Sequence, residues 1–205
     1  MEVKFHNEIS LKLGVQSAEH PTSKAGREYV RATAEFEGVP FEILGFDPEK
    51  LAGLTPGEHI VTGRLGYEET PDGEPRYIIY ADGMPEKGRV NSAVLTLHAG
   101  PAEARYSAEG MMWTRLRAFL SMGKDKDGNY KPALWLTVKG FAVPSSESED
   151  GYDEELPTFL SNLKSGELFT VWGRLQSGLS GELEIIVRYA HPVRREEQPL
   201  EEVEA

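Results

Sequence analysis

The sequence predicts an all-β protein built from two similar units in series, and three observations support this prediction. Hydrophobic and polar residues alternate at residues 9–13 and 93–97, a period of two that is typical of half-buried strands. The same order of strand-like, loop-like and helix-like segments follows each of these runs. Both series contain the tripeptide Gly-Arg-Leu, at residues 63–65 and 173–175. Matching order, spacing and tripeptide together indicate a tandem duplication.

Each unit is expected to hold five strands, with a short helix between the third and the fourth. A polar loop ending in glycine, at Gly26 or Gly110, follows the first strand, and a turn with glycine, at Gly57 or Gly166, ends each helix. In the first unit the expected strands are residues 9–13, 29–36, 40–46, 59–65 and 76–80, and the expected helix is 48–54. In the second unit the expected strands are residues 93–97, 113–119, 135–141, 170–175 and 182–189, and the expected helix is 156–163.

Five strands with a helix between the third and the fourth is the plan of the OB-fold, a small, partly open Greek-key barrel. One continuous β-sandwich is the alternative, and the repeat disfavours it. The charged segment 82–88, with its glycines and proline, marks the boundary. The prediction is an N-terminal OB-fold at 1–84, a C-terminal OB-fold at 89–193 and an acidic tail at 194–205. So small a barrel needs a filled interior, here expected from Leu95, Leu97, Leu116, Val138, Phe169 and Val171.

Composition excludes several classes of protein and site. No apolar run approaches the ~18 residues of a membrane span, and the amino terminus lacks the basic-then-apolar pattern of a signal peptide, so a cytoplasmic protein is expected. The chain has no cysteine and five scattered histidines, which argues against disulfides and against a metal centre. No nucleophile elbow, phosphate loop or zinc-ligand spacing is present. We therefore expect neither catalysis nor a cofactor.

Charge is segregated along a chain whose net charge is -12. Residues 105–139 carry seven Lys and Arg against three acids, whereas the first 88 residues carry nine bases and 16 acids. The basic residues are interleaved with aromatic ones on strand-like segments, a pattern suited to following a phosphate backbone and stacking bases. The second unit is thus the better candidate for a polyanion surface. A solvated sheet face over core aromatics is the alternative.

Alternation along the strands predicts which side chains face outward. An outward Trp135 would stack on bases, and the alternative is that it fills the mouth of the barrel. Trp113 alternates with Arg115 and Arg117 and shares their face, or packs against a neighbour. If Phe169 and Val171 face inward, Trp172 faces outward, either to a base or to a subunit interface. The cations expected at phosphates, each with solvated surface as the alternative, are Arg105, Arg115, Arg117, Lys124, Lys126, Lys131, Lys139 and Arg174.

The loop at residues 124–129, Lys-Asp-Lys-Asp-Gly-Asn, resembles a metal-binding loop only superficially. Lysine occupies alternate positions, where a metal-binding loop has oxygen ligands. A hairpin tip is the expected structure.

The second unit resembles the single-stranded DNA-binding protein family of bacteria over nearly all of residues 90–191. The resemblance rests on the Val-Asn opening at 90–91, the segment from Gly100 to Gly110 with Glu-Ala-Arg-Tyr at 103–106, the aromatic-x5-aromatic spacing of Trp135 and Phe141, and the stretch from Lys164 to Leu175. It implies that Trp135 and Phe141 stack on bases. In the first unit Pro40 stands at the position of Trp135, which leaves only Phe46.

Other positions depart from the family pattern. Met-Gly-Lys at 122–124 replaces a loop aromatic, the hairpin at 177–181 is short and lacks a stacking Trp, and the tail lacks the Asp-rich tip that ends in Pro-Phe. The resemblance also implies a homodimer presenting four barrels and contacts with replication or repair proteins.

The leading hypothesis is sequence-independent binding of single-stranded DNA in replication, recombination or repair. The alternative is a non-catalytic structural or protein-interaction module, favoured by the acidic first unit and by the missing aromatics.

Overall fold

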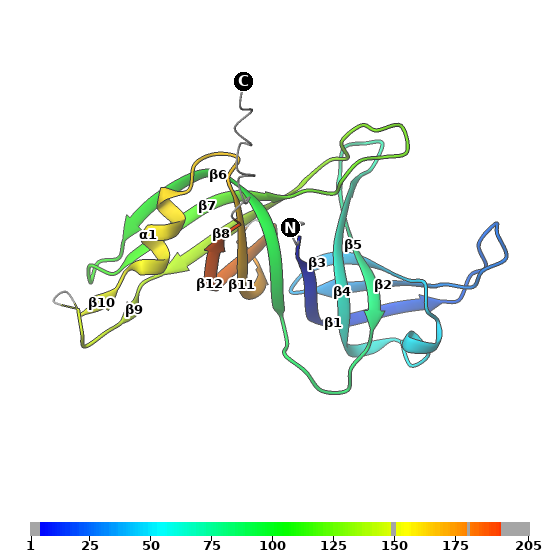
Figure 1. Ribbon diagram of the computed structural model, residues 1–205. Helices are drawn as coiled ribbons and strands as arrows, with labels where there is room; N and C mark the ends of the chain where they lie inside the picture. Colours follow the sequence, from blue (N-terminus) through cyan, green and yellow to red (C-terminus); the bar gives the residue numbers. More distant parts are fainter. Residues whose placement is uncertain (1–4, 149–150, 180, 194–205) are drawn as a thin grey trace, which may run out of the picture.

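Strands make up most of the computed structural model, which describes residues 5–148, 151–179 and 181–193 (Figure 1). The predicted all-β class is confirmed. The elements of the first half are β1 (Asn7–Glu19), β2 (Val30–Phe36), β3 (Val39–Gly45), the 3-10 turn η1 (Glu49–Leu51), β4 (Gly57–Glu69) and β5 (Pro75–Gly83). Those of the second half are β6 (Ser92–Tyr106), β7 (Met112–Leu120), β8 (Leu134–Phe141), β9 (Val143–Pro144), β10 (Tyr152–Asp153), α1 (Glu155–Asn162), β11 (Leu168–Ser177) and β12 (Leu183–Pro192).

The first five strands close into a barrel. Strand β1 pairs with β2 and with β4, β2 pairs with β3, and β5 pairs with β3 and β4. All of these pairs are antiparallel except β3–β5. Alternation along β2 places every second side chain inside, as the period-two pattern of the sequence predicts.

The strands after residue 92 pair in the same order. Strand β6 pairs with β7 and β11, β7 with β8, and β12 with β11 and, in parallel, with β8. Strand β1 also pairs with β6, so that Asn7 lies opposite Leu95 and Ser10 opposite Ser92. This pairing joins the two halves of Figure 1, with β1–β5 on the right and β6–β12 and α1 on the left.

The Gly-Arg-Leu tripeptide lies at a bulge in each half. The register shifts between Thr62 and Gly63 in β4 and between Trp172 and Gly173 in β11. A Cβ on Gly63 would collide with the carbonyl oxygen of Tyr80, and one on Gly173 with that of Ile186. Glycine is therefore needed at both positions because the facing backbone approaches too closely for any side chain.

A buried leucine closes one end of each barrel-like set of strands. Leu51 of η1 packs over Gly45 of β3, and Leu160 of α1 packs over Gly140 of β8, each where a Cβ on the glycine would lie. The helix expected at 156–163 is confirmed as α1. The helix expected at 48–54 is wrong in type and length, because three residues of 3-10 turn suffice to bring Leu51 onto Gly45.

The interior of the second half is filled as predicted. Leu95, Leu97, Leu116, Val138, Phe169 and Val171 are all fully buried. Two short strands, β9 and β10, pair with each other and were not predicted. Among the described residues, no helix is long and apolar enough to cross a membrane. The predicted acidic tail at 194–205 lies outside the described residues.

Candidate nucleic-acid interface

Two pairs of aromatic rings lie across β7 and β8. Trp113 lies opposite Phe141 and Phe119 opposite Trp135 in the antiparallel register. The first pair is stacked, with ring centroids 5.8 Å apart and planes 15° apart, and the second is tilted, with centroids 5.0 Å apart. His98 of β6 continues the second row, because its ring stacks on Phe119 at 4.6 Å.

Cationic side chains fill the rows between these two aromatic pairs. Alternation along β7 brings Trp113, Arg115 and Arg117 to one face, as predicted, and Arg115 lies opposite Lys139 of β8. The Arg105 guanidinium lies 5.4 Å from the centroid of the Trp113 ring. We define the aromatic–cationic face by the residues of β6, β7 and β8 that share this surface: His98, Glu103, Arg105, Trp113, Arg115, Arg117, Phe119, Trp135, Thr137, Lys139 and Phe141.

Trp135 keeps 46% of its surface exposed, which argues against the alternative that it fills the barrel. Its ring lies above Gly100 of β6, beside the bulge between Ala99 and Ala102. A Cβ on Gly100 would lie 2.6 Å from the carbonyl oxygen of Arg117 and 3.3 Å from the Trp135 ring. The missing side chain at residue 100 thus lets the indole lie against the sheet with its other side open.

Carboxylates neutralise part of the charge on the aromatic–cationic face. Arg117 pairs with Glu182 at 2.8 Å and Lys139 with Glu184 at 2.7 Å. The Glu184 carboxylate is 8% exposed, so this second pair is partly buried. Arg115 makes no ion pair with any described residue, which leaves its guanidinium ready to meet an external anion.

Glu103 is the acidic member of the face. It lies opposite Arg115 and accepts a hydrogen bond from Arg105 at 2.6 Å. This hydrogen bond, together with the charges of Arg105 and Arg115, lowers the pKa of the Glu103 carboxyl, and the same bond raises the pKa of Arg105. Glu103 is therefore ionised near neutral pH and competes with an incoming phosphate for Arg105.

The three lysines between β7 and β8 lie on a hairpin loop rather than on the strand face. Lys124 and Tyr130 form an isolated bridge, with the ammonium 4.7 Å from the Tyr130 ring centroid. Asp125 accepts hydrogen bonds from the backbone N–H groups of Asp127 and Asn129, which lower its pKa. The predicted hairpin tip is confirmed. Among the described residues no group of three or more His, Asp or Glu is placed to hold a metal ion.

The other two loop lysines, Lys126 and Lys131, make no ion pair with a described residue. They remain candidates for phosphate contacts in the loop that precedes β8.

Trp172 and Arg174 lie apart from the aromatic–cationic face, on β11. Phe169 and Val171 are buried and Trp172 is half-buried, as alternation predicts. The Arg89 guanidinium covers the Trp172 ring at 4.4 Å, and Tyr189 of β12 lies 5.6 Å from it. The structure therefore places these two predicted residues in a second cluster.

The first half reproduces one aromatic pair of the face and lacks the other. Phe46, 71% exposed, lies 6.4 Å from Tyr29, and this pair matches Phe141 and Trp113 in register. At the positions that match Trp135 and Phe119, Pro40 lies opposite Glu35.

The row between these positions is also changed in the first half. Glu42 takes the position of Thr137 and accepts hydrogen bonds from Arg31 and Arg76. Its carboxylate forms ion pairs with Arg31 and Arg76, whose charges would otherwise face solvent.

Several residues of these clusters were missed in the sequence, Tyr189 among them. Phe119 continues the alternation of Trp113, Arg115 and Arg117, and Tyr29 aligns with Trp113, so both could have been found by period and by repeat. His98 and Arg89 could not, because they reach their rings only through strand pairing and the path of the linker.

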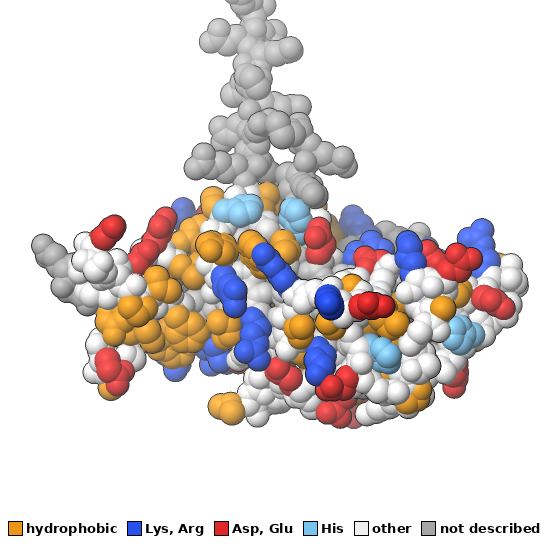
Figure 2. Space-filling model, turned by 90° about the horizontal axis from the view of Figure 1, so that it is seen from below, with side chains coloured by type: hydrophobic (Ala, Val, Ile, Leu, Met, Phe, Trp, Pro, Cys, Tyr) orange, Lys and Arg blue, Asp and Glu red, His pale blue; other side chains and the backbone are white. Residues whose placement is uncertain are grey.

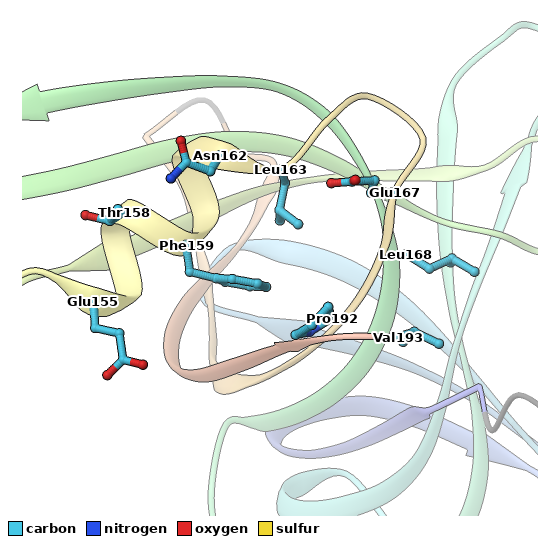
Figure 3. Close-up of a pocket in the computed structure, with 9 residues that line it drawn as sticks. All are labelled: Glu155, Thr158, Phe159, Asn162, Leu163, Glu167, Leu168, Pro192 and Val193. Atoms are coloured by element: carbon cyan, nitrogen blue, oxygen red, sulfur yellow. The ribbon is translucent and has the colours of Figure 1, made fainter. Parts of the chain in front are cut away.

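A pocket of about 500 Å³ lies between α1, the start of β11 and the end of β12, away from the aromatic–cationic face (Figure 3). Phe159 extends into it from α1 toward Pro192 and Val193 at the end of β12. Among the described residues, the charged side chains that line it are two carboxylates, Glu155 and Glu167.

Figure 2 shows the molecule from below. Hydrophobic side chains gather on the left, the half that holds β7, β8 and α1 in Figure 1, and Lys and Arg side chains lie beside them toward the middle. Hydrophobic and cationic side chains therefore adjoin on this surface of a chain whose net charge is negative.

Two of the solved structures that match do so over nearly the whole chain. A deletion mutant of the single-stranded DNA-binding protein from Thermus aquaticus matches with a TM-score of 0.63 and 19% identity, covering 98% of this chain and 100% of that one. The wild-type protein matches with a TM-score of 0.60 and 18% identity, covering 95% and 96%. The chain has the fold of a bacterial single-stranded DNA-binding protein. No protein-family model and no curated protein matches the sequence.

Proposed function

We propose that the protein binds single-stranded DNA without sequence preference and without catalysis. The aromatic–cationic face carries this proposal, because two ring pairs are separated by rows of cations on one sheet surface. Rings stack on any base, and cations meet the phosphates between stacked bases. The fold shared with the Thermus aquaticus protein supports the same function.

Binding on this face exchanges ion pairs. The incoming phosphates meet Arg115 first, since it has no carboxylate partner among the described residues. Arg105, Arg117 and Lys139 already contact carboxylates, and phosphates replace or share those partners. Each phosphate that a cation neutralises releases counterions, so affinity falls as salt rises.

We further propose that the chain is a tandem of two OB-folds, at residues 1–84 and 89–193. A duplication is supported by the identical order of strand pairing in the two halves and by the bulge glycines Gly63 and Gly173. It is also supported by the leucine that packs over a glycine of β3 in the first half and of β8 in the second. The first OB-fold retains Tyr29 and Phe46 and adds a weaker contact to the same strand of DNA.

A homodimer presenting four barrels in the cytoplasm, at the nucleoid, completes the proposal. Replication, recombination and repair are the processes that expose the substrate, and their proteins are the expected partners. The alternative, a structural or protein-interaction OB-fold module, is favoured by the carboxylates that pair with Arg117 and Lys139.

Titration of a fluorescently labelled oligothymidine, followed by anisotropy at low and at high salt, tests the function. We expect saturable binding that weakens with salt, and weaker binding to duplex DNA of the same length. A chain that leaves the anisotropy unchanged at low salt while remaining folded would establish the interaction module instead. Light scattering of the free chain tests the homodimer.

A further inference from the structure

A second cluster of aromatic and cationic side chains lies on β11 and β12, beside the linker between the halves. It forms a pocket of about 360 Å³ lined by Trp172, Tyr189, Arg89, Arg174 and Arg188, and the lining contains no carboxylate from the part of the chain that the structure describes. Tyr189 is 66% exposed, and Trp172 lies opposite it in the strand register. In so acidic a chain, three arginines around two rings form a local site for an anion that carries a flat group.

The bulge of β11 and β12 creates this site. Trp172 pairs with Tyr189 and Gly173 with Val187, so Arg188 is the extra residue of the bulge. As a result Arg188 and Tyr189, neighbours in sequence, are both exposed instead of alternating. The bulge thereby presents a cation and a ring side by side.

The linker supplies the third wall of the pocket and is fixed by hydrogen bonds. The carbonyl oxygen of Arg89 accepts from the Ser10 hydroxyl at 2.6 Å, and that of Asn91 accepts from the Leu175 N–H at 2.8 Å. These bonds hold the Arg89 guanidinium over the Trp172 ring. Because the bonds use the backbone of Arg89, its side chain can be removed without releasing the linker.

The matched bulge in the first half has no such site. Thr62 and Asp82 stand where Trp172 and Arg188 stand, and the Thr62 hydroxyl donates a hydrogen bond to Asp82 at 2.9 Å. Both halves have the bulge and its glycine, so the bulge by itself does not require aromatic or arginine side chains beside it. A ligand would explain why the second half carries rings and arginines at these positions.

We propose that this linker pocket is a second contact site for single-stranded DNA, which takes one nucleotide after the strand leaves the aromatic–cationic face. Tyr189 and the Arg89 guanidinium plane provide surfaces for a base, and Arg188 provides charge for its phosphate. Arg174 pairs with Glu37 at 3.5 Å, so a phosphate there shares or replaces that carboxylate. This inference rests on the proposed function. It predicts that long single strands gain affinity from the pocket and short ones do not.

The test compares oligothymidines of about 8 and about 30 nucleotides, within and beyond the span of one OB-fold. The variant Arg89→Ala/Arg188→Ala should reduce the salt slope of binding for the long strand by about 1.4, at about 0.7 per cation, and leave the short strand unchanged. The variant Arg64→Ala/Lys50→Ala, which removes two exposed cations of the first half, is the matched control and should change neither. Equal slopes for wild type and Arg89→Ala/Arg188→Ala on the long strand would overturn the pocket alone.

A second readout reports on the pocket directly. The chain has three tryptophans, so Trp113→Phe/Trp135→Phe leaves Trp172 as the sole indole and keeps stacking rings on the other face. The long strand should quench Trp172 emission and the short strand should not. Unchanged emission with a long strand that is bound would overturn the pocket, as would a loss of dimer in Arg89→Ala/Arg188→Ala, which marks a subunit interface. If the wild type binds neither length, the proposed function and the pocket both fail.

Discussion

At the residue scale, the Trp135 ring is exposed on one side and packs against Gly100 on the other. Replacing it with alanine removes one stacking surface and leaves the core intact. Trp135→Ala should weaken oligothymidine binding by about 1–3 kcal/mol and change the free energy of unfolding by less than about 1 kcal/mol. Anisotropy titration and denaturant unfolding measure the two effects. Phe5→Ala, which removes an exposed ring outside the face, is the control.

Arg115 and Lys139 face each other across β7 and β8 but differ in their partners. Arg115→Ala should reduce the salt slope by about 0.7 and leave stability unchanged, because Arg115 has no ion pair with a described residue. Lys139→Ala leaves the nearly buried Glu184 carboxylate without its cation and should cost about 2 kcal/mol of stability. Thermal unfolding together with titrations at several salt concentrations measures both. Equal effects of the two variants would contradict this division of roles.

Glu103 holds Arg105 away from an incoming phosphate. Its pKa is lowered, chiefly by the Arg105 hydrogen bond, so the carboxylate stays charged as the pH falls into the range where an ordinary glutamate protonates. Glu103→Gln should therefore raise affinity about twofold at neutral pH, and the ratio of the two affinities should stay constant down to about pH 5, because the carboxylate remains charged there. Titration of both forms at each pH checks this. A decrease on removing the carboxylate would show that Glu103 positions Arg105 for binding.

At the scale of single elements, glycines in the strands determine where helices and bulges can pack. Gly140→Ala would push Leu160 away from β8 and should cost about 1–3 kcal/mol of stability, and Gly45→Ala should act in the same way on Leu51. Gly14→Ala is the control, since a Cβ there would lie 3.9 Å from the carbonyl oxygen of Glu35, an ordinary contact. Denaturant unfolding measures the three variants. A cost at Gly14 equal to the others would contradict the packing explanation, because the lower entropy of the unfolded chain should make alanine neutral or stabilising there.

At the scale of the whole molecule, the two halves are joined by more than the linker. Strand β1 pairs with β6, and Glu37 of the first half accepts a hydrogen bond from the Ser177 N–H and pairs with Arg174 of the second. We expect one cooperative unfolding transition, because neither half can lose its strands without exposing an edge of the other. Scanning calorimetry should give equal calorimetric and van't Hoff enthalpies. Two resolved transitions would show that the halves unfold independently.

Much of this architecture could be predicted from local pattern. Period-two alternation fixes which side of a strand each side chain occupies, so the shared face of Trp113, Arg115 and Arg117 follows from the sequence. The matched Gly-Arg-Leu tripeptides predicted a repeated element, and the structure gives the reason in the close approach of backbone at Gly63 and Gly173. These features depend on neighbours along the chain, which the sequence displays directly.

Only the tertiary structure decided which groups meet. Glu182 and Glu184 are distant in sequence from Arg117 and Lys139, and the parallel pairing of β12 with β8 brings them together. The path of the linker places the Arg89 guanidinium over the Trp172 ring of β11, whereas Trp113 and Trp135 lie on β7 and β8. Alternation specifies a face but not the strand that will lie beside it, because register, bulges and the path of a linker are set by contacts between residues far apart in the chain.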